Sequence, residues 1–450
     1  MVSKISVVIP AYNGGTQLDE CLNALARLAT APSEIIVVDD GSTDGSIQRA
    51  AEHSLGVRIL ATSGRMGPAT ARNMGAQAAT GDILFFLDAD VCVHADATER
   101  LAAAFADPAI DAVIGSYDDD PSSRDFLSQY KNLMHCFVHQ NARSEASTFW
   151  SGCGAIRREI FLTMSGFDAS YRRPAIEDIE LGYRLCHAGR RILLDRDLRV
   201  KHLKKWTFWG LLKTDVLDRG IPWTELILRD QKMPNDLNLQ ISQRVSIGLV
   251  YLMLLYAAEH ALRYGGYALL PLVTILFILL GSFWSDAAEK RSLGVCAAMI
   301  AGAAAIVLCA WKIHMRGLIP LVVAIVPLLF LRHRYDKRGA RWDFWNAWFH
   351  GLYIVVVIAV SMLYLKDRYF ITAVVAGVLV LATLNNGFYL ILSEKRGRLF
   401  ALAAFPCHLL YHFYNGVSFV MGSLLWSARA MKARTEDVDR PAGAFPPARK

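Results

Sequence analysis

The sequence predicts an α/β domain with a mostly parallel sheet, followed by an α-helical transmembrane domain. Two observations favour this fold class. Short β-branched runs alternate with helical patterns through the first 200 residues or so, which is typical of a sheet covered on both faces. Hydrophobic residues make up 54% of the 450-residue chain, and their excess falls after about residue 240. A chain of this length also exceeds one ordinary hydrophobic core.

The first part of the chain alternates predicted strands with predicted helices. Runs of Val, Ile, Leu and Ala indicate strands at 5–9, 35–38, 57–61, 83–87 and 112–115. Helical patterns lie between them at 17–29, 44–53, 68–79 and 96–106. A polar segment, partly helical over 122–141, precedes helices at 158–165 and 177–188 and strands near 191–195 and 198–202. We assign residues 1–202 to this α/β domain, whose ligands should bind outside the carboxyl ends of the strands.

Residues 203–240 combine aromatic and basic side chains and predict an amphipathic helix in the membrane interface. The pattern is carried by Lys204, Lys205, Trp206, Phe208, Trp209 and Lys213. Pro222 is expected to interrupt this helix.

Residues 241–426 predict six or seven membrane spans, each close to the ~20 residues that cross ~30 Å of hydrocarbon. We place six of them at 245–262, 267–284, 293–311, 317–331, 346–365 and 370–392. The stretch 399–426 contains Pro406, His408 and His412, so it is either a seventh span or a re-entrant or interfacial segment. The tail, 427–450, is expected to be disordered.

Charge and cysteine usage exclude several classes of protein. The net charge is +7, but basic residues cluster beside apolar segments, as in Arg332–Arg341, rather than along one nucleic-acid-binding stripe. Eight scattered cysteines contain no C-x-x-C pair, which gives neither a zinc site nor a disulfide framework and fits a reducing cytosol. The N-terminus lacks the pattern of a signal peptide, so we expect the first domain to stay cytosolic, with the loops 285–292, 332–345 and 393–398 on the same side.

Acidic residues follow two of the predicted strands. Asp39 and Asp40 come after the second strand, where a carboxylate can accept hydrogen bonds from a nucleotide base or ribose. The alternative is that this Asp-Asp-Gly-Ser-Thr-Asp run only forms a turn and a helix cap. Asp88 and Asp90 follow the fourth strand and can point to one side, where carboxylate oxygens hold Mg²⁺ or Mn²⁺; the alternative is a solvated loop end.

Five motifs occur in the order and spacing of glycosyltransferase family 2, which the chain resembles over residues 4–206. They are Val8-Ile9-Pro10-Ala11-Tyr12-Asn13, Asp39–Asp44, Ala71-Arg72-Asn73-x-Gly75, Asp88-x-Asp90 and Glu177-Asp178-x-Glu180-Leu181. The resemblance implies the Rossmann-like GT-A fold and inverting transfer from a UDP- or GDP-linked sugar. It also implies contacts to the nucleotide sugar from Pro10, Ala11, Tyr12, Asp39, Asp40, Arg72 and Asp88, and metal ligands at Asp88, Asp90 and His202. His202 is equally compatible with a structural role.

The resemblance implies that Asp178 is the catalytic base, with Glu177 as its neighbour. Both acids stand at the start of a predicted helix, where free amides and the helix dipole keep a carboxylate ionised. The alternative is that they only cap the helix. Arg65 is a further candidate for donor contact, and Trp150, Gly152 and Gly154 are candidates for the floor of an acceptor site or for close strand packing.

The spacing from His202 to Trp206 is that of the Q-x-x-R-W motif of processive polysaccharide synthases, but His and Lys replace Gln and Arg. Because Lys lacks the bidentate fork of Arg, we favour single transfer over polymerisation. The expected function is therefore metal-dependent transfer to a lipid or lipid-linked glycan acceptor at the cytosolic face of the cell membrane, without nucleic acid as partner. Two alternatives remain: a processive polysaccharide synthase, and a catalytically inactive scaffold that binds glycan or nucleotide sugar.

Overall fold

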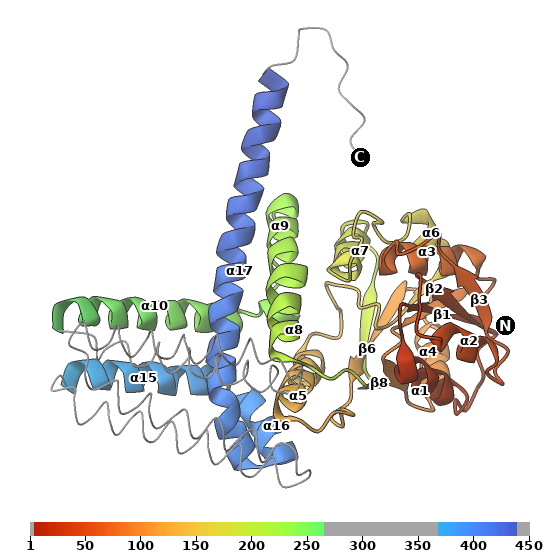
Figure 1. Cartoon of the computed structure of the whole chain (residues 1–450). Coiled ribbons are helices and arrows are strands. Elements are labelled where there is room, and N and C mark those ends of the chain that lie inside the picture. Colours follow the sequence, from red (N-terminus) through yellow and green to blue (C-terminus); the bar gives the residue numbers. More distant parts are fainter. Residues whose placement is uncertain (1–3, 265–367, 439–450) are drawn as a thin grey trace.

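The computed structural model describes residues 4–264 and 368–438 (Figure 1). Its N-terminal part is an α/β domain around one eight-stranded sheet, with strand order β3-β2-β1-β4-β7-β6-β8-β5. Helices follow this domain, and Figure 1 shows them on the side of the sheet away from the N-terminus. The expectation of an α/β sheet followed by helices is confirmed.

The sheet is mixed in direction. Parallel ladders join β1 to β2 and β4, β2 to β3, and β6 to β8, whereas β7 runs antiparallel to β4 and β6, and β5 antiparallel to β8. The strands are β1 (Ile5–Ala11), β2 (Glu34–Asp39), β3 (Arg58–Ala61), β4 (Ile83–Leu87), β5 (Val91–Val93), β6 (Ala112–Tyr117), β7 (Cys153–Arg157) and β8 (Ile192–His202). The parallel half agrees with the sequence analysis, which did not anticipate the antiparallel β5 and β7.

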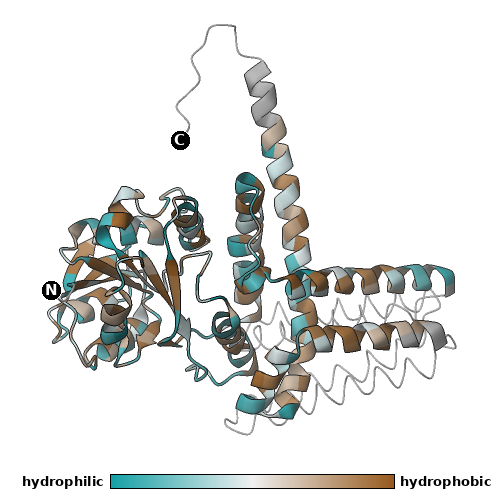
Figure 2. Cartoon of the chain, turned by 180° about the vertical axis from the view of Figure 1, so that it is seen from behind, coloured by the Kyte–Doolittle hydropathy of each residue, from teal (hydrophilic) through white to brown (hydrophobic). Residues whose placement is uncertain are grey.

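Helices cover both faces of the sheet. They are α1 (Gly15–Leu25), α2 (Ser46–Ala51), α3 (Pro68–Ala78), α4 (Ala97–Ala104), α5 (Phe126–Asn141), α6 (Arg158–Thr163) and α7 (Glu177–His187). Successive residues of β1 point to opposite faces, so Val7 packs in the cluster with Leu18 of α1 while Val8 packs in the cluster with Ala71 of α3. Figure 2 shows the resulting apolar strands between helices of mixed polarity.

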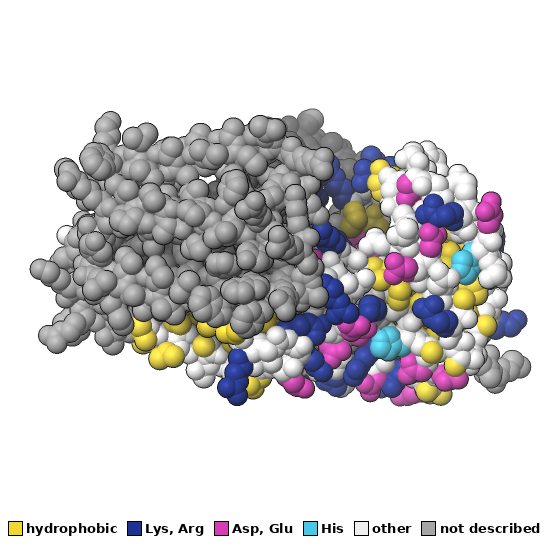
Figure 3. Space-filling view, turned by 60° about the horizontal axis from the view of Figure 1, so that its bottom comes forward, with side chains coloured by type: hydrophobic (Ala, Val, Ile, Leu, Met, Phe, Trp, Pro, Cys, Tyr) yellow, Lys and Arg dark blue, Asp and Glu magenta, His cyan; other side chains and the backbone are white. Residues whose placement is uncertain are grey.

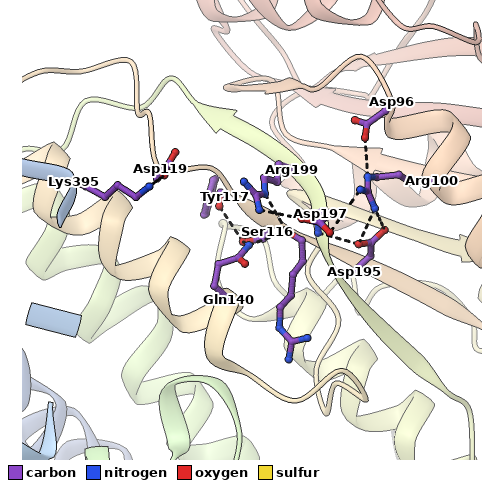
Figure 4. Close-up of polar contacts among 11 residues, drawn as sticks. Asp96, Arg100, Ser116, Tyr117, Asp119, Gln140, Asp195, Asp197, Arg199 and Lys395 are labelled. Carbon is purple, nitrogen blue, oxygen red and sulfur yellow. Dashed lines mark hydrogen bonds and ion pairs between the residues drawn. The ribbon is translucent and has the colours of Figure 1, made fainter. Parts of the chain in front are cut away.

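One irregularity shapes the sheet beside the active site. The pairing of β6 with β8 shifts register between Ile114 and Ser116. A Cβ at Gly115 would lie 2.3 Å from the carbonyl oxygen of Leu198, so the backbones meet here at a distance that only glycine allows. Gln140 of α5 fixes the shift by donating to Ser116 Oγ at 3.1 Å and to the carbonyl oxygen of Arg196 at 2.8 Å (Figure 4). The two strands predicted near 191–195 and 198–202 are therefore one strand.

The segment after the sheet is a continuous helical stretch made of α8 (Phe208–Leu212), the π-helix η1 (Lys213–Gly220) and α9 (Ile221–Asp230). The expectation that Pro222 interrupts a helix is wrong. Pro222 occupies the first turn of α9, and the wider turns of η1 directly before it accommodate a residue that lacks an N–H donor. The short η2 (Leu237–Leu239) follows.

The last described elements are α10 (Ile241–Tyr264), α15 (Arg368–Leu384), α16 (Asn386–Arg396) and α17 (Arg398–Val438). In the described part, the stretch Ile241–His260 is long and apolar enough to cross a membrane. The expected span at 370–392 is broken: Ala373–Leu384 and Asn386–Arg396 meet at 73°, so they form at most one bent span. The expected spans at 267–284, 293–311, 317–331 and 346–365, and the loops 285–292 and 332–345, lie outside the described residues.

Two expectations concern helix α17. Pro406 lies inside it, so 399–426 is one helix; burial of Phe400, Ala403 and Leu410 around the proline offsets the lost backbone hydrogen bond. The helix also continues to Val438, so the predicted disordered tail begins no earlier than residue 439. Residues 427–438 are rich in helix formers, and Arg429 pairs with Glu225 of α9 at 2.6 Å.

The helical part is tied to the α/β domain by ion pairs and a shared apolar cluster. The cluster includes Phe126 and Tyr130 of α5 with Phe388 of α16. Lys395 pairs with Asp119 at 2.6 Å (Figure 4), and Arg396 donates to Gln129 Oε1 at 2.5 Å. Figure 3 shows several Lys and Arg side chains close together on this face of the described part. The expected cytosolic loop 393–398 therefore lies against the α/β domain.

Candidate active site

The site is built at the carboxyl ends of β1, β2 and β4, as expected for an open sheet of this kind. Ala11 of β1 pairs with Asp39 of β2, so the motifs that follow these strands lie side by side. Asn13, in the left-handed region with φ of 51°, accepts from Thr43 N at 2.8 Å and locks the two loops together. Pro10, Ala11 and Asp39 thus share one edge of the sheet.

Asp40 and Asp39 differ in their surroundings. Asp40 is buried, and its two oxygens accept from Thr62 Oγ1 at 2.9 Å, Met66 N at 2.8 Å and Gly67 N at 2.8 Å. It therefore organises the loop that leads into α3. Asp39 is partly exposed and accepts from the backbone N–H of Ser42 at 2.8 Å.

An exposed ring stands beside these strand ends. Tyr12 is 42% exposed, and the guanidinium of Arg65 lies 4.2 Å from its ring centroid. A stacked guanidinium and phenol offer a flat, cationic surface that suits a nucleotide base or phosphate. Both residues were candidates from the sequence, and the structure brings them together.

Arg72 connects two of the acidic motifs. It lies in α3 with 5% of its side chain exposed, and it pairs with Asp88 Oδ1 at 2.7 Å and Glu177 Oε1 at 2.9 Å. Burial alone would lower the pKa of Arg72, but the two carboxylates raise it, so the guanidinium stays charged. Burial raises the pKa of Glu177, which is also 5% exposed, and Arg72 opposes that rise.

Asp90 faces His202 across the β5–β8 end of the sheet. Asp90 Oδ2 lies 3.6 Å from His202 Nε2, and His202 Nδ1 lies 2.6 Å from Asn132 Oδ1. Because Asn132 Oδ1 can only accept, Nδ1 carries a proton, and Nε2 is the ring nitrogen that faces Asp90. Burial would raise the pKa of Asp90, yet the contact with His202 and the charge of Lys204 lower it, so the carboxylate is ionised.

These residues fit Mg²⁺ or Mn²⁺ held jointly with a substrate. In the described ranges, no group of three or more His, Cys, Asp or Glu side chains is gathered closely enough to hold a metal ion. Asp90 and His202 are in place, whereas Asp88 is turned to Arg72. Mg²⁺ commonly binds one or two carboxylates and completes its shell with substrate phosphates and water, and an imidazole with a fixed tautomer is a suitable further ligand for Mn²⁺.

Asp178 lies in the first turn of α7 and is held from the neighbouring loop. Its Oδ2 accepts from Ser151 N at 3.0 Å and Ser151 Oγ at 3.1 Å, and Oδ1 lies against its own helix at Ile179 N. Asp178 is partly exposed, unlike the buried Glu177. The backbone places it near the metal motif, because Asp88 N donates to the carbonyl oxygen of Gly152 at 3.3 Å.

The small residues of this loop serve close packing. A Cβ at Gly152 would lie 3.0 Å from Asp88 Oδ2, and one at Gly154 would lie 2.2 Å from the carbonyl oxygen of Trp150. The strand-packing alternative therefore accounts for Gly154. Gly152 leaves room for the Asp88 side chain.

An aromatic cluster borders the site and was not foreseen. Tyr117 of β6 lies 4.5 Å from the ring of His202 and 4.6 Å from that of Trp150, centroid to centroid. His135 and His139 of α5 stack on the same Tyr117 at 5.6 and 6.1 Å. Their spacing of four residues places both on one helix face, which was the available sequence signal.

Comparisons with known proteins agree with this geometry. Residues 6–179 match the family model described as Glycosyl transferase family 2. A glycosyltransferase of Haloferax volcanii, AglE, is 34% identical over 221 residues, which are 44% of this chain and 71% of that protein. The validoxylamine A glucosyltransferase of Streptomyces hygroscopicus subsp. limoneus is 31% identical over 231 residues, 44% of this chain and 51% of that protein. The chain thus spans about half the length of the Streptomyces enzyme.

Among solved structures, a mannosyltransferase of Pyrobaculum calidifontis in complex with GDP-Man and Mn²⁺ aligns with a TM-score of 0.41 at 22% identity. It covers 75% of this chain, and the chain covers 89% of it. The sheet and the family match define a sugar-transferring α/β enzyme. The chain belongs to glycosyltransferase family 2.

Proposed function

We propose that this protein is an inverting, metal-dependent glycosyltransferase that adds one sugar to a lipid or lipid-linked acceptor at the cytosolic surface of the cell membrane. The observation that carries the proposal is the joining of Asp88 and Glu177 by Arg72, with Asp90 on one side and Asp178 on the other. In this arrangement a donor-binding edge, a metal-compatible pair and a partly exposed carboxylate share one site.

The donor nucleotide would bind at the strand ends. Pro10, Ala11 and Tyr12 provide the backbone and ring surface, and Asp39 provides a carboxylate for base or ribose. Arg72, which lies beside Asp88, would contact the phosphates of the donor. Asp40 stays in the proposed nucleotide site, and its oxygens also hold the 62–67 loop.

The metal proposal rests on Asp90 and His202, with Asp88 as the third ligand. Asp88 would have to turn partly from Arg72, which its 34% side-chain exposure allows. When bound, Mg²⁺ or Mn²⁺ would neutralise charge on the departing nucleotide diphosphate. Asn132 fixes the tautomer that leaves His202 Nε2 free to coordinate.

Asp178 is proposed as the base that takes the proton of the acceptor hydroxyl. Two hydrogen bonds from Ser151 fix the direction of Oδ2. Glu177 cannot serve in the same way, because its side chain is buried and paired with Arg72. Asp178 would take the proton while the acceptor oxygen attacks the anomeric carbon opposite the nucleotide diphosphate, whose bond to that carbon breaks. A single displacement of this kind inverts the anomeric configuration.

The membrane assignment follows from the helices that dock on the α/β domain. We propose an α/β domain at 1–202, an interfacial segment at 203–240 and a transmembrane domain at 241–426. Support comes from the apolar stretch Ile241–His260 and from Lys395, whose ion pair with Asp119 keeps the 393–398 loop on the side of the α/β domain. A lipid acceptor would then reach the site from the helical part.

A donor screen tests the proposed function. The full chain, purified in detergent, is incubated with UDP- and GDP-sugars and Mn²⁺ or Mg²⁺, and nucleotide diphosphate release is followed with and without membrane lipid extract. We expect release with one donor, stimulated by lipid, with a single sugar in the product. Donor binding without release in any lipid would favour the scaffold, and products of many sugars would favour the polysaccharide synthase.

A further inference from the structure

A row of basic and imidazole side chains lies where the active site meets the docked helices. Lys131, His135 and His139 follow one another at intervals of four on α5, so they share one face of that helix. Lys131 Nζ pairs with Asp215 Oδ2 of η1 at 2.6 Å, which fixes η1 against this face. Arg219 follows Asp215 by about one helical turn, within electrostatic reach of both histidines.

Two further cations, Lys204 and Arg219, lie within electrostatic reach of Lys131. Lys131 is neutralised by Asp215, whereas within the described ranges no acidic oxygen lies at ion-pair distance from Lys204 Nζ or the Arg219 guanidinium, and Asp90 acts on Lys204 only from a longer distance. Lys204 instead lies over the ring of Trp206, 4.3 Å from its centroid. A partly buried cation without a partner is costly, so this region favours an anionic ligand.

The two histidines add unused hydrogen-bonding capacity. His135 Nδ1 and His139 Nδ1 are buried, and neither has a hydrogen-bond partner in the part of the chain that the structure describes. Native proteins satisfy most buried polar atoms, and an orphaned pair at one place calls for a ligand or water. A protonated ring nitrogen is a donor suited to a phosphate oxygen.

This row is continuous with the proposed catalytic groups. Tyr117 contacts His135 and His139 on one side and His202 and Trp150 on the other. Trp150 directly precedes Ser151, which holds Asp178. On the far side, Asp215 also accepts from Tyr414 of α17. A ligand along this row would therefore run from the base toward the helical part.

We propose that Lys204, Arg219, His135 and His139 bind a phosphate group of the acceptor, so that the acceptor is a phosphate-bearing lipid. This proposal rests on the proposed function and specifies its substrate class. The donor also carries phosphates, but its place is at the strand ends with Arg72 and Asp90. The row lies on α5 and η1, and η1 packs against α17, which is the direction from which a lipid-anchored acceptor arrives.

Binding measurements on the full chain in detergent test the assignment without requiring turnover. Dodecyl phosphate and uncharged dodecanol are titrated separately, with tryptophan fluorescence as readout, and UDP and GDP are titrated with Mn²⁺. We expect wild type to bind the alkyl phosphate more tightly than the alcohol. Arg219→Gln and Lys204→Gln should each weaken alkyl phosphate binding by about ten- to a hundredfold, which is the scale of one charge-assisted hydrogen bond.

Controls separate charge from folding and acceptor from donor. Lys213→Gln, in the same π-helix but 56% exposed and paired with Asp218, should change nothing. Arg219→Lys should restore part of the lost affinity. Weaker binding of the nucleotide diphosphate with unchanged alkyl phosphate binding would assign the row to the donor and overturn the proposal. Equal binding of the phosphate and the alcohol to wild type would overturn it as well, even if glycosyl transfer has been demonstrated.

Discussion

Replacing Arg72 with Met should destabilise the α/β domain strongly, because Arg72 is the buried cation that joins two acidic motifs. Arg72 and Glu177 are each 5% exposed, so the substitution leaves the Glu177 carboxylate buried, with Ala175 N as its remaining donor outside its own helix. Breaking a buried pair by removing one partner costs about 3–5 kcal/mol. Asp88 is more accessible to water and adds less to the loss.

The stability lost in Arg72→Met should depend on pH and on the presence of the Glu177 carboxylate. Burial already raises the pKa of Glu177, and loss of Arg72 raises it further. A group with a raised folded-state pKa stabilises the fold fully below its unfolded-state pKa and loses that contribution as pH rises through the folded value. The Arg72→Met deficit should therefore be larger at pH 8 than at pH 5. Arg72→Met/Glu177→Gln should recover about 1–3 kcal/mol relative to Arg72→Met.

Thermal unfolding of the full chain in detergent, followed by tryptophan fluorescence, measures these effects. With about 2–4 °C per kcal/mol for a domain of 150–250 residues, Arg72→Met should lower the transition by about 6–20 °C. The matched control is Arg58→Met, since Arg58 is 51% exposed and lies 4.0 Å from Glu34; it should shift the transition by less than about 2 °C. A small Arg72→Met effect, or a double variant less stable than Arg72→Met, would refute the reasoning.

Three further predictions address the metal, the sheet edge and the topology. Asp90→Asn should lower Mn²⁺- or Mg²⁺-dependent turnover by about a hundredfold or more, and full wild-type turnover in excess EDTA would count against the assignment. Partial burial opposes ionisation of Glu34, but hydrogen bonds from Ser6 and Thr80 hold its pKa below the ordinary value. Glu34→Gln should therefore lower thermal stability at pH 7. The difference in stability from wild type should shrink as the pH falls through that lowered pKa. In a chain without its own cysteines, Glu394→Cys should react with an impermeant thiol reagent only after cell permeabilisation and Arg263→Cys in intact cells; the reverse pattern would invert the proposed topology.

Local pattern predicted the parallel half of the sheet. The β-branched runs of β1 and β2 and the apolar run of β4 are buried strands, and their predicted ends differ from the observed ones by at most two residues. The strand β7 was not predicted, because Cys153–Arg157 contains a glycine and too few β-branched residues. It also enters the sheet by pairing with segments that are distant in sequence. Pro222 misled because a proline in the first turn of a helix gives the same local signal as a helix breaker.

In the candidate site, too, features set by local sequence could be predicted, whereas contacts between distant segments could not. The acidic motifs could be found because each follows a strand or opens a helix, where short-range rules apply. The sequence did not show that Asp40 accepts hydrogen bonds from the 62–67 loop, or that Glu177 rather than Asp178 pairs with Arg72. The sequence did not predict that the side chains from Lys131 to Arg219 lie together, because they converge only when α5 and η1 pack against each other.

The most direct test of the account is Asp178→Asn, measured for both turnover and donor binding. The variant should fold and bind the nucleotide sugar nearly as wild type does, because the hydrogen bonds described for the Asp178 side chain go to Ser151 and to its own helix, not to residues proposed to bind the nucleotide. Its turnover should fall by about 10²–10⁴-fold, the contribution expected of a general base, and Glu177→Gln should cost less. Loss of nucleotide binding in step with turnover, or a Glu177→Gln variant less active than Asp178→Asn, would contradict the account.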